Sequence, residues 1–351
     1  MKRTLPALAV WLCMIGAAAA AFQPDASRRL VDLPPRTAGP VPVSIDFFLL
    51  DVDDIDGSNE TFAAALYLSM KWTDPRLAFD PAEFGSDRVI YPGPAAAEQL
   101  GQIWSPAVDV ENLVGAPETL DECLTIMADG TVEYERRLSG VFSSEMELSR
   151  YPFDRQVLQV RLESFMWNSS DLQLVVNDGS SSGQPSNVSE SLNIRGWNMV
   201  SFGVEVNSHL YPTGDSYSRF VSHMVVDRDP WFCIWAVILP LVLVTFFALT
   251  CFFWDQEVLS ERIALALYAM LTVTAQSLVV ADELPKISYF TRVDYAFFLT
   301  YAVLLAVTVE SLIAKSVNER DRLLADRIDA NSARVVATIY VVGMAVIFFV
   351  L

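Results

Sequence analysis

Hydrophobic and polar residues follow two patterns along the chain, and the pattern changes at Pro230. Before that residue, apolar side chains alternate with polar ones over short stretches, which is typical of strands with one buried face. The alternation is clearest at Leu158, Val160 and Leu162 and at Leu172, Leu174 and Val176. Turn dipeptides separate such stretches, at Asp56-Gly57, Asp129-Gly130 and Asp178-Gly179. Residues 22–229 are therefore predicted to form an antiparallel β-sandwich of the immunoglobulin-like kind.

After Pro230 the chain carries long apolar segments instead. Trp231–Trp254 and Ile263–Ala281 hold no charged residue, and Glu310 interrupts the third segment. Because a bilayer core about 30 Å thick needs about 20 helical residues, residues 230–351 are predicted to form a transmembrane domain of four helices. The expected helices are 231–254, 260–282, 292–314 and 334–351. Pro240 is tolerated in a membrane helix, where we expect it to cause a kink.

Two segments indicate the orientation in the membrane. Lys2 and Arg3 precede an apolar run that ends in the small residues Ala17–Ala21, so residues 1–21 are predicted to be a secretory signal peptide. The connection Lys315–Arg334 is basic, which is typical of the cytoplasmic side. This connection is short and is expected to be helical, without a separate intracellular domain. The N-terminal domain and the C-terminus are then both expected outside.

The composition fits an acidic exported part joined to an apolar membrane part. The chain has 351 residues, of which 52% are hydrophobic, and its formal net charge is −19. So acidic a surface disfavours nucleic-acid binding and enriches cations nearby. The sequence has two histidines and neither a nucleophile elbow nor a His-metal constellation, which argues against a hydrolase or a zinc enzyme. We therefore predict a protein that is not an enzyme and needs no cofactor.

The second predicted helix carries a stripe that ends in acidic residues. Residues three and four positions apart lie on one helix face, and this stripe consists of Ala264, Tyr268, Leu271, Ala275, Leu278 and Asp282. Glu261 precedes the stripe on the cytoplasmic side, and Asp282 and Glu283 end it outside. If several copies surround an axis, acidic rings at the pore mouths favour cations, and Leu271 and Leu278 form a hydrophobic constriction.

Another interpretation of this helix stays open. Thr272, Thr274, Gln276 and Ser277 could be polar contacts between helices, and the terminal charges could lie at the membrane interface. The Tyr268 ring is also bulky for a conduction path, unless it rotates aside in the open state. A non-conducting sensor on a four-helix anchor would nevertheless need no such polar stripe with acidic ends.

Several motifs, in a fixed order, resemble those of the pentameric ligand-gated ion channels, the Cys-loop receptor superfamily. They are Trp72-Thr73-Asp74, Trp104-Ser105-Pro106 with Asn112, Tyr151-Pro152-Phe153-Asp154-Arg155-Gln156, Arg228-Asp229-Pro230, Ser260-Glu261-Arg262 and Leu284-Pro285. The third of these resembles the core of the family's signature loop, which here spans residues 144–158. The cysteines that close this loop in animal receptors would fall at Ser144 and Leu158, so the chain is most similar to the bacterial branch, which lacks that disulfide.

The resemblance implies a homopentamer in a lipid bilayer, with a small-molecule agonist bound at each extracellular subunit interface. Residues implied at the agonist site are Glu163 and Phe165, Tyr211 and Tyr217 on the principal face, and Tyr67, Tyr134 and Glu135 on the complementary face. Aromatic rings around a carboxylate suit a small cation such as a primary amine, through cation–π attraction and a charge-assisted hydrogen bond. The bacterial branch implies the inner membrane, with the N-terminal domain and the C-terminus in the periplasm.

The resemblance also implies where binding is coupled to opening. Asp154 and Pro152 on the signature loop, and Arg228 before the first membrane helix, correspond to the family's junction between the two domains. An acidic run fits the loop between the first two strands, with Asp51, Asp53, Asp54 and Asp56. It does not match a calcium-binding helix-loop-helix motif, so a looser divalent-cation site with Ca²⁺ modulation, or simply solvated charge, are the alternatives. We predict a ligand-gated channel for monovalent cations; gating by pH and anion selectivity are the other possibilities within this class.

Overall fold

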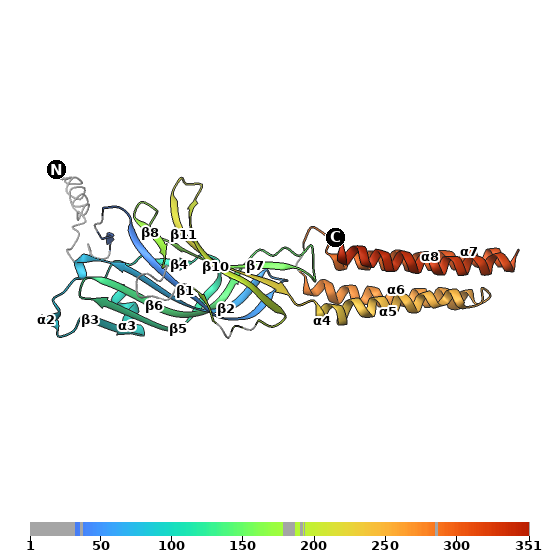
Figure 1. Ribbon diagram of the computed structural model, residues 1–351, viewed down its shortest axis with the longest axis horizontal. Coiled ribbons are helices and arrows are strands. Elements are labelled where there is room, and N and C mark those ends of the chain that lie inside the picture. Colours follow the sequence, from blue (N-terminus) through green and yellow to red (C-terminus); the bar gives the residue numbers. More distant parts are fainter. Residues whose placement is uncertain are drawn as a thin grey trace, which may run out of the picture.

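The computed structural model describes residues 32–35, 38–177, 187–189, 192, 194–284 and 287–350, without the side chains of residues 187, 282 and 283. A β-rich part and an elongated bundle of helices lie end to end, and the chain passes from one to the other directly after β11 (Figure 1). The predicted signal peptide 1–21, the turn at Asp178-Gly179 and the Asp282 side chain lie outside the described residues.

Two β-sheets form the N-terminal part. The larger has the order β3-β5-β6-β2-β1-β8, with β9 also pairing with β1, and the smaller has the order β10-β11-β7-β4. The strands of the larger sheet are β1 (Val41–Asp56), β2 (Thr61–Thr73), β3 (Arg88–Pro92), β5 (Leu113–Met127), β6 (Thr131–Ser143), β8 (Leu172–Val176) and β9 (Asn187–Val188). Those of the smaller sheet are β4 (Val108–Val110), β7 (Arg155–Ser164), β10 (Trp197–Leu210) and β11 (Ser216–Arg228). Most neighbours are antiparallel, as predicted, but β8 and β9 run parallel to β1.

The hydrophobic core lies between the two sheets, because alternate side chains of each strand point inward. Leu158, Val160 and Leu162 of β7 are buried, as are Leu172 and Leu174 of β8, which confirms the predicted alternation. Aromatic residues join the sheets: the ring of Phe47 on β1 lies 5.9 Å from that of Phe220 on β11. Burial of side chains of this size is worth about 1.5–3 kcal/mol each, so the sandwich is held mainly by this layer. The short helices η1 (Pro75–Leu77), α2 (Pro81–Phe84) and α3 (Pro94–Leu100) lie in the connections between strands.

Four helical spans in the described residues are long and apolar enough to cross a membrane. The first, Trp231–Phe253, comprises α4 (Trp231–Cys233), the π-helical η2 (Ile234–Ile238), α5 (Leu239–Leu249) and the 3₁₀-helical η3 (Thr250–Phe253). The others are α6 (Leu259–Glu283), α7 (Arg292–Asn318) and α8 (Arg322–Phe349). The last helix begins twelve positions before the predicted residue 334, because apolarity marks the membrane-crossing part while Asp321 caps a helix that starts earlier.

The break in the first span lies directly before Pro240. Proline has no N–H and its ring collides with the carbonyl four residues back, and the chain here adopts the π-helical turns of η2. The side-chain amide of Gln276 on α6 donates to the Val237 carbonyl at 2.7 Å. A residue of the second helix thus satisfies a backbone group within the irregular turn, as membrane helices require.

The acidic run after Leu50 belongs to a strand rather than to a loop. Strand β1 continues through Asp56 and pairs with β2, with bulges near Asp51 and Asp54. The turn itself is residues 57–60, where the Asp56 carboxylate accepts hydrogen bonds from the Ser58 hydroxyl and the Asn59 amide, both at 2.7 Å. These bonds hold the pKa of Asp56 below its usual range, the Ser58 hydroxyl having the largest effect. The prediction of an acidic loop was therefore wrong in its boundaries.

Candidate functional site

The predicted pore stripe lies on an open face of α6. Glu261, Tyr268, Leu271, Ala275 and Leu278 are exposed in the single chain, and Ala264 is half-buried. Leu271 is 69% exposed although leucine is one of the most apolar residue types. The opposite face of the helix packs against its own bundle through Ala266, Ala269, Val273 and Val280, which are buried. The stripe is therefore left uncovered by the chain's own helices.

The polar residues of α6 divide into two groups. The hydroxyls of Thr272 and Thr274 donate to carbonyls of their own helix, those of Tyr268 and Met270, each at 2.9 Å. Gln276 reaches the first span, as described above, and the Ser277 hydroxyl lies 3.2 Å from that of Tyr301 on α7. Thr274 belongs to both groups, because the Tyr301 hydroxyl of α7 donates to its Oγ1 at 3.4 Å. The interpretation as contacts between helices therefore holds for Thr274, Gln276 and Ser277, which lie beside the stripe rather than on it.

A buried acid and its partners form the centre of the principal face. The Glu163 side chain accepts from the Tyr211 hydroxyl at 2.7 Å and from Arg219 Nε at 2.8 Å. The hydrogen bond from Tyr211 to Glu163 raises the pKa of the tyrosine. The Tyr211 ring meets that of Tyr217 edge-on, with the centroids 5.4 Å apart. The structure thus brings together three of the four residues implied for this face.

The fourth residue and several unpredicted ones surround this centre. Phe165 lies two residues after Glu163 and is 83% exposed, so its ring is available to a partner or ligand. Three unpredicted residues also lie here. Arg219 Nη2 lies 3.4 Å from Glu111 Oε1, and the His209 ring lies 4.6 Å from that of Tyr211. Arg219 could have been found, because it lies two positions after Tyr217 on the same strand and so points to the same face.

On the complementary face, strand geometry separates two residues that were assigned together. Tyr67 on β2 donates a hydrogen bond to Glu135 on β6, and both line a depression of about 260 Å³ with Asp121, Glu122, Cys123, Arg136 and Arg137. Burial and the Glu135 carboxylate raise the pKa of Tyr67. Tyr134 points to the other side of β6, into the core, so its assignment to the ligand face was wrong: neighbouring residues of a strand face opposite ways.

Tyr134 is instead a residue of the sandwich interior whose hydroxyl reaches the edge. It donates to Glu122 at 2.7 Å, and burial with this bond raises the pKa of Tyr134 to about 12. Its ring therefore supports the strand that carries Glu135 rather than contacting a ligand.

Asp154 and Arg228 form the expected ion pair where the two parts of the molecule meet. Arg228 Nε lies 2.7 Å from Asp154 Oδ1, and Nη2 lies 3.1 Å from Oδ2. The guanidinium also lies over Trp197, 4.1 Å from the ring centroid, and over Tyr151 at 5.0 Å. The peptide bond before Pro152 is cis. This junction joins the signature loop to the last residue of β11, three residues before the first membrane helix.

Asp51, Asp53, Asp54 and Asp56 do not converge on a cation. Because they follow one strand, their side chains lie on both of its faces. Within the described part of the chain no group of three or more His, Cys, Asp or Glu residues is arranged to hold a metal ion. One subunit alone therefore offers no support for the divalent site.

Residues 31–230 match the neurotransmitter-gated ion-channel ligand binding domain, and residues 237–323 match the transmembrane region of the same channels. The chain belongs to the neurotransmitter-gated, or Cys-loop, ion-channel family. This confirms the resemblance and the two-part fold, with an extracellular ligand-binding domain and a membrane domain. Members of this family are ion channels, not enzymes, as predicted.

Relatives of the chain include bacterial and animal channels of this family. It is 27% identical to the proton-gated ion channel of Gloeobacter violaceus over 79% of this chain and 74% of that protein. It is 25% identical to the human gamma-aminobutyric acid receptor subunit rho-3 over 73% of this chain and 54% of the subunit. It is 27% identical to the gamma-aminobutyric acid receptor subunit beta of Caenorhabditis elegans, over 76% and 48%. The chain thus spans about half the length of these receptor subunits.

This family member closes its signature loop without a disulfide. The three described cysteines, Cys123, Cys233 and Cys251, are not joined in a disulfide. Where animal relatives have the first cysteine of the loop, the Ser144 hydroxyl donates to the carbonyl of Val157 at 3.0 Å, one residue before Leu158. A partly buried side-chain hydrogen bond thus joins the two ends of the loop, and it does not depend on the redox state of the compartment.

Proposed function

We propose that the chain is one subunit of a homopentameric, cation-selective channel of the bacterial inner membrane, opened by an agonist at the periplasmic subunit interfaces. The observation that carries the proposal is the exposed stripe of α6, with Glu261 at its inner end. Five such stripes around an axis would place a ring of carboxylates at the cytoplasmic entrance, and rings of this kind favour cations. Leu271 and Leu278 supply the apolar constriction that closes the pore by dewetting.

The proposed agonist is a small organic cation. On the principal face, Glu163 lies among Tyr211, Tyr217 and the exposed Phe165, and the complementary face brings Tyr67 with Glu135. Carboxylates with aromatic rings suit an ammonium group. Glu163 is already bound by Arg219 and Tyr211, so the aromatic rings and the acids of the complementary face are expected to provide most of the attraction.

Voltage clamp of the reconstituted protein tests the proposal. We expect primary amines to evoke currents whose reversal potential in a salt gradient follows the monovalent cation, and Glu261→Gln to shift that potential toward the anion. Glu257→Gln is a matched control, because it removes an acid on the cytoplasmic side that is paired with Lys315 away from the stripe. Absence of current under every condition would refute the channel, and a reversal potential that follows chloride would refute its cation selectivity.

Gating by protons is the second candidate. It is favoured by the similarity to a protein described as a proton-gated ion channel over 79% of this chain. A current evoked by a step to acidic pH in the absence of amines, and unaffected by Phe165→Ala, would favour this candidate. A current that needs an amine and is weakened by Phe165→Ala would favour the organic agonist.

A further inference from the structure

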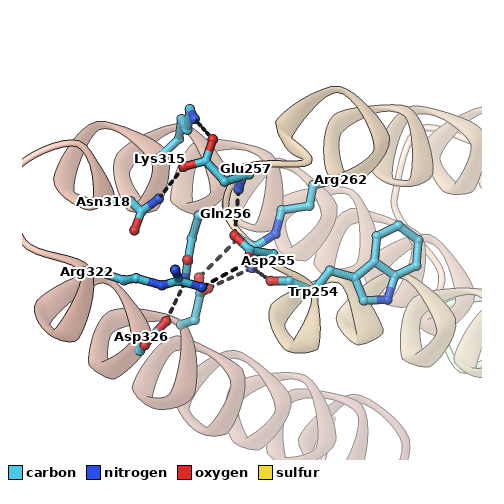
Figure 2. Close-up of polar contacts among 10 residues, drawn as sticks. Trp254, Asp255, Gln256, Glu257, Arg262, Lys315, Asn318, Arg322 and Asp326 are labelled. Carbon is cyan, nitrogen blue, oxygen red and sulfur yellow. Dashed lines mark hydrogen bonds and ion pairs between the residues drawn. The ribbon is translucent and has the colours of Figure 1, made fainter.

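The inner end of the pore helix is anchored by an arginine that is completely buried. Arg262 follows Glu261 on α6, and its side chain is 0% exposed. It binds the Asp329 carboxylate of α8 through both terminal nitrogens, with Nη1 at 3.2 Å from Oδ1 and Nη2 at 2.7 Å from Oδ2. Nη2 also donates to the Trp254 carbonyl at the end of the first span, at 2.5 Å (Figure 2). One guanidinium thus joins three of the four spans.

A glutamine holds Asp329 in place for this contact. Gln256, in the short connection between the first span and α6, donates through Nε2 to Asp329 Oδ2 at 2.7 Å and to Asp326 Oδ1 at 3.0 Å. Figure 2 shows this connection lying among the ends of the helices, with Gln256 beside Asp326. The other ion pairs here, Lys315 with Glu257 and Arg322 with Asp255, each have one side chain that is at least 66% exposed and therefore contribute little.

The direction of Glu261 depends on this anchor. Successive residues of an α-helix are turned by about 100°, so fixing Arg262 toward α8 fixes Glu261 on the open face of α6. Glu261 itself is exposed, and the hydrogen bond that it accepts comes from its neighbour Ser260, at 2.7 Å. Its own contacts therefore cannot set the rotation of the helix.

A second carboxylate, that of Glu310, lies in the surroundings of the arginine. Glu310 on α7 has both carboxylate oxygens buried without a hydrogen-bond partner of ordinary geometry among the described residues. The groups around it are Arg262 from α6, Asp329 and Ser332 from α8, and Cys251 from η3. Without the Asp329 charge, we expect Arg262 to turn toward Glu310, and α6 to turn with it.

We propose that Asp329, acting through Arg262, sets the rotation of the inner end of α6 and so places Glu261 at the pore entrance. Asp329 is thus a positioning residue, and the outermost helix α8 takes part in ion selectivity. The inference rests on the proposed function for its readout, since selectivity has meaning only in a conducting pore. It goes beyond that function because it assigns a role to a helix that does not line the pore.

The test compares Asp329→Asn with Asp326→Asn in reconstituted channels. Both variants remove one negative charge from the same end of α8, but Asp326 does not contact Arg262. We expect the cation-to-anion permeability ratio to fall several-fold for Asp329→Asn, to stay unchanged for Asp326→Asn, and to recover with Asp329→Glu. An unchanged ratio in an assembled Asp329→Asn channel overturns the inference. If Asp329→Asn does not assemble, Gln256→Met should lower the ratio by a smaller factor, and an unchanged ratio there overturns it equally.

Cysteine labelling tests the rotation without any current. Ala264→Cys lies on the stripe and Leu265→Cys one position further around the helix, so a cationic thiol reagent should modify the first faster, as measured by mass spectrometry of the α6 peptide. We expect this contrast to shrink in the Asp329→Asn background and to persist in the Asp326→Asn background. If the wild-type protein gives no current, yet the labelling contrast shrinks in the Asp329→Asn background, the proposed function is refuted while the anchor is supported. Labelling that is the same in all backgrounds sinks the anchor.

Discussion

Removing the charge of Asp154 should destabilise the junction between the two domains far more than removing the charge of Asp227. Its side chain is 1% exposed and that of Arg228 is 19% exposed, with two hydrogen bonds between them. A second ion pair lies next to this one, between Arg155 on β7 and Asp227 on β11, and its side chains are 60% and 40% exposed. Asp154→Asn and Asp227→Asn are therefore matched changes of one charge, made in a buried and in an exposed pair.

The expected magnitudes differ several-fold. Loss of one partner from a buried pair costs about 3–5 kcal/mol. Because Arg228 keeps its contacts with Trp197 and Tyr151, we expect the lower end, about 3 kcal/mol, for Asp154→Asn. An exposed pair is worth about 0.2–1 kcal/mol. At about 2–4 °C per kcal/mol for a domain of this size, the melting temperature should fall by about 6–12 °C for Asp154→Asn and by less than about 4 °C for Asp227→Asn.

Thermal unfolding of the purified protein in detergent, followed by tryptophan fluorescence, measures both shifts. Repeating it at about 1 M salt, where the screening length falls to about 3 Å, should remove most of the Asp227→Asn effect and leave most of the Asp154→Asn effect. Equal shifts for the two variants, or an Asp154→Asn shift that disappears in salt, would show that the junction ion pair contributes no more to stability than an exposed pair.

Three further results are expected. The pKa of Asp56 is lowered in the folded state, so its contribution to stability is present above the ordinary value of 3.8 and is lost as the pH falls through the folded value. Asp56→Asn should therefore make the melting temperature fall less steeply in this acidic range, and an unchanged fall contradicts the assignment. Gln276→Leu removes the amide that reaches the Val237 carbonyl and should cost about 0.5–2 kcal/mol in thermal stability. Thr272→Val, whose hydroxyl donates to a carbonyl of its own helix, should cost less, and the reverse order would exclude the amide contact as the cause. Leu271→Ala should shift the agonist response to lower concentrations, and unchanged gating removes Leu271 as the constriction.

Features that depend on local periodicity could be predicted from the sequence. The alternation around Val160 in β7 indicated the buried face of a strand, and the spacing of three and four indicated the open face of α6, because one repeat length determines each. The four apolar spans followed from length and composition alone. The start of α8 could not be placed in this way, since its first turns are charged and are held by the Asp321 cap and by contacts such as Asp329 with Arg262.

Features that depend on register or on distant packing were missed or misplaced. Assigning Tyr134 with Glu135 followed a resemblance and ignored the period of two, which already separates neighbouring strand residues. His209 joins the ligand face only through the pairing of β10 with β11, which the sequence did not specify. The acidic end of β1 was assigned to the loop between the first two strands by resemblance, yet Val52 is buried in the core and holds this segment in the sheet.

The hydrogen bond from Tyr211 to Glu163 has a consequence for agonist affinity. Tyr211 lies in the hairpin between β10 and β11, so this bond holds the hairpin against the sheet before any agonist binds. Hydrogen bonds to a charged group are worth about 1.5–3 kcal/mol. An agonist that must take the place of Tyr211 on Glu163 therefore binds a state that is populated only in a small fraction of sites. Its apparent dissociation constant rises by the inverse of that fraction, about tenfold or more. Tyr211→Phe removes this hydrogen bond, so a channel whose agonist displaces the tyrosine should respond to lower agonist concentrations, not higher ones.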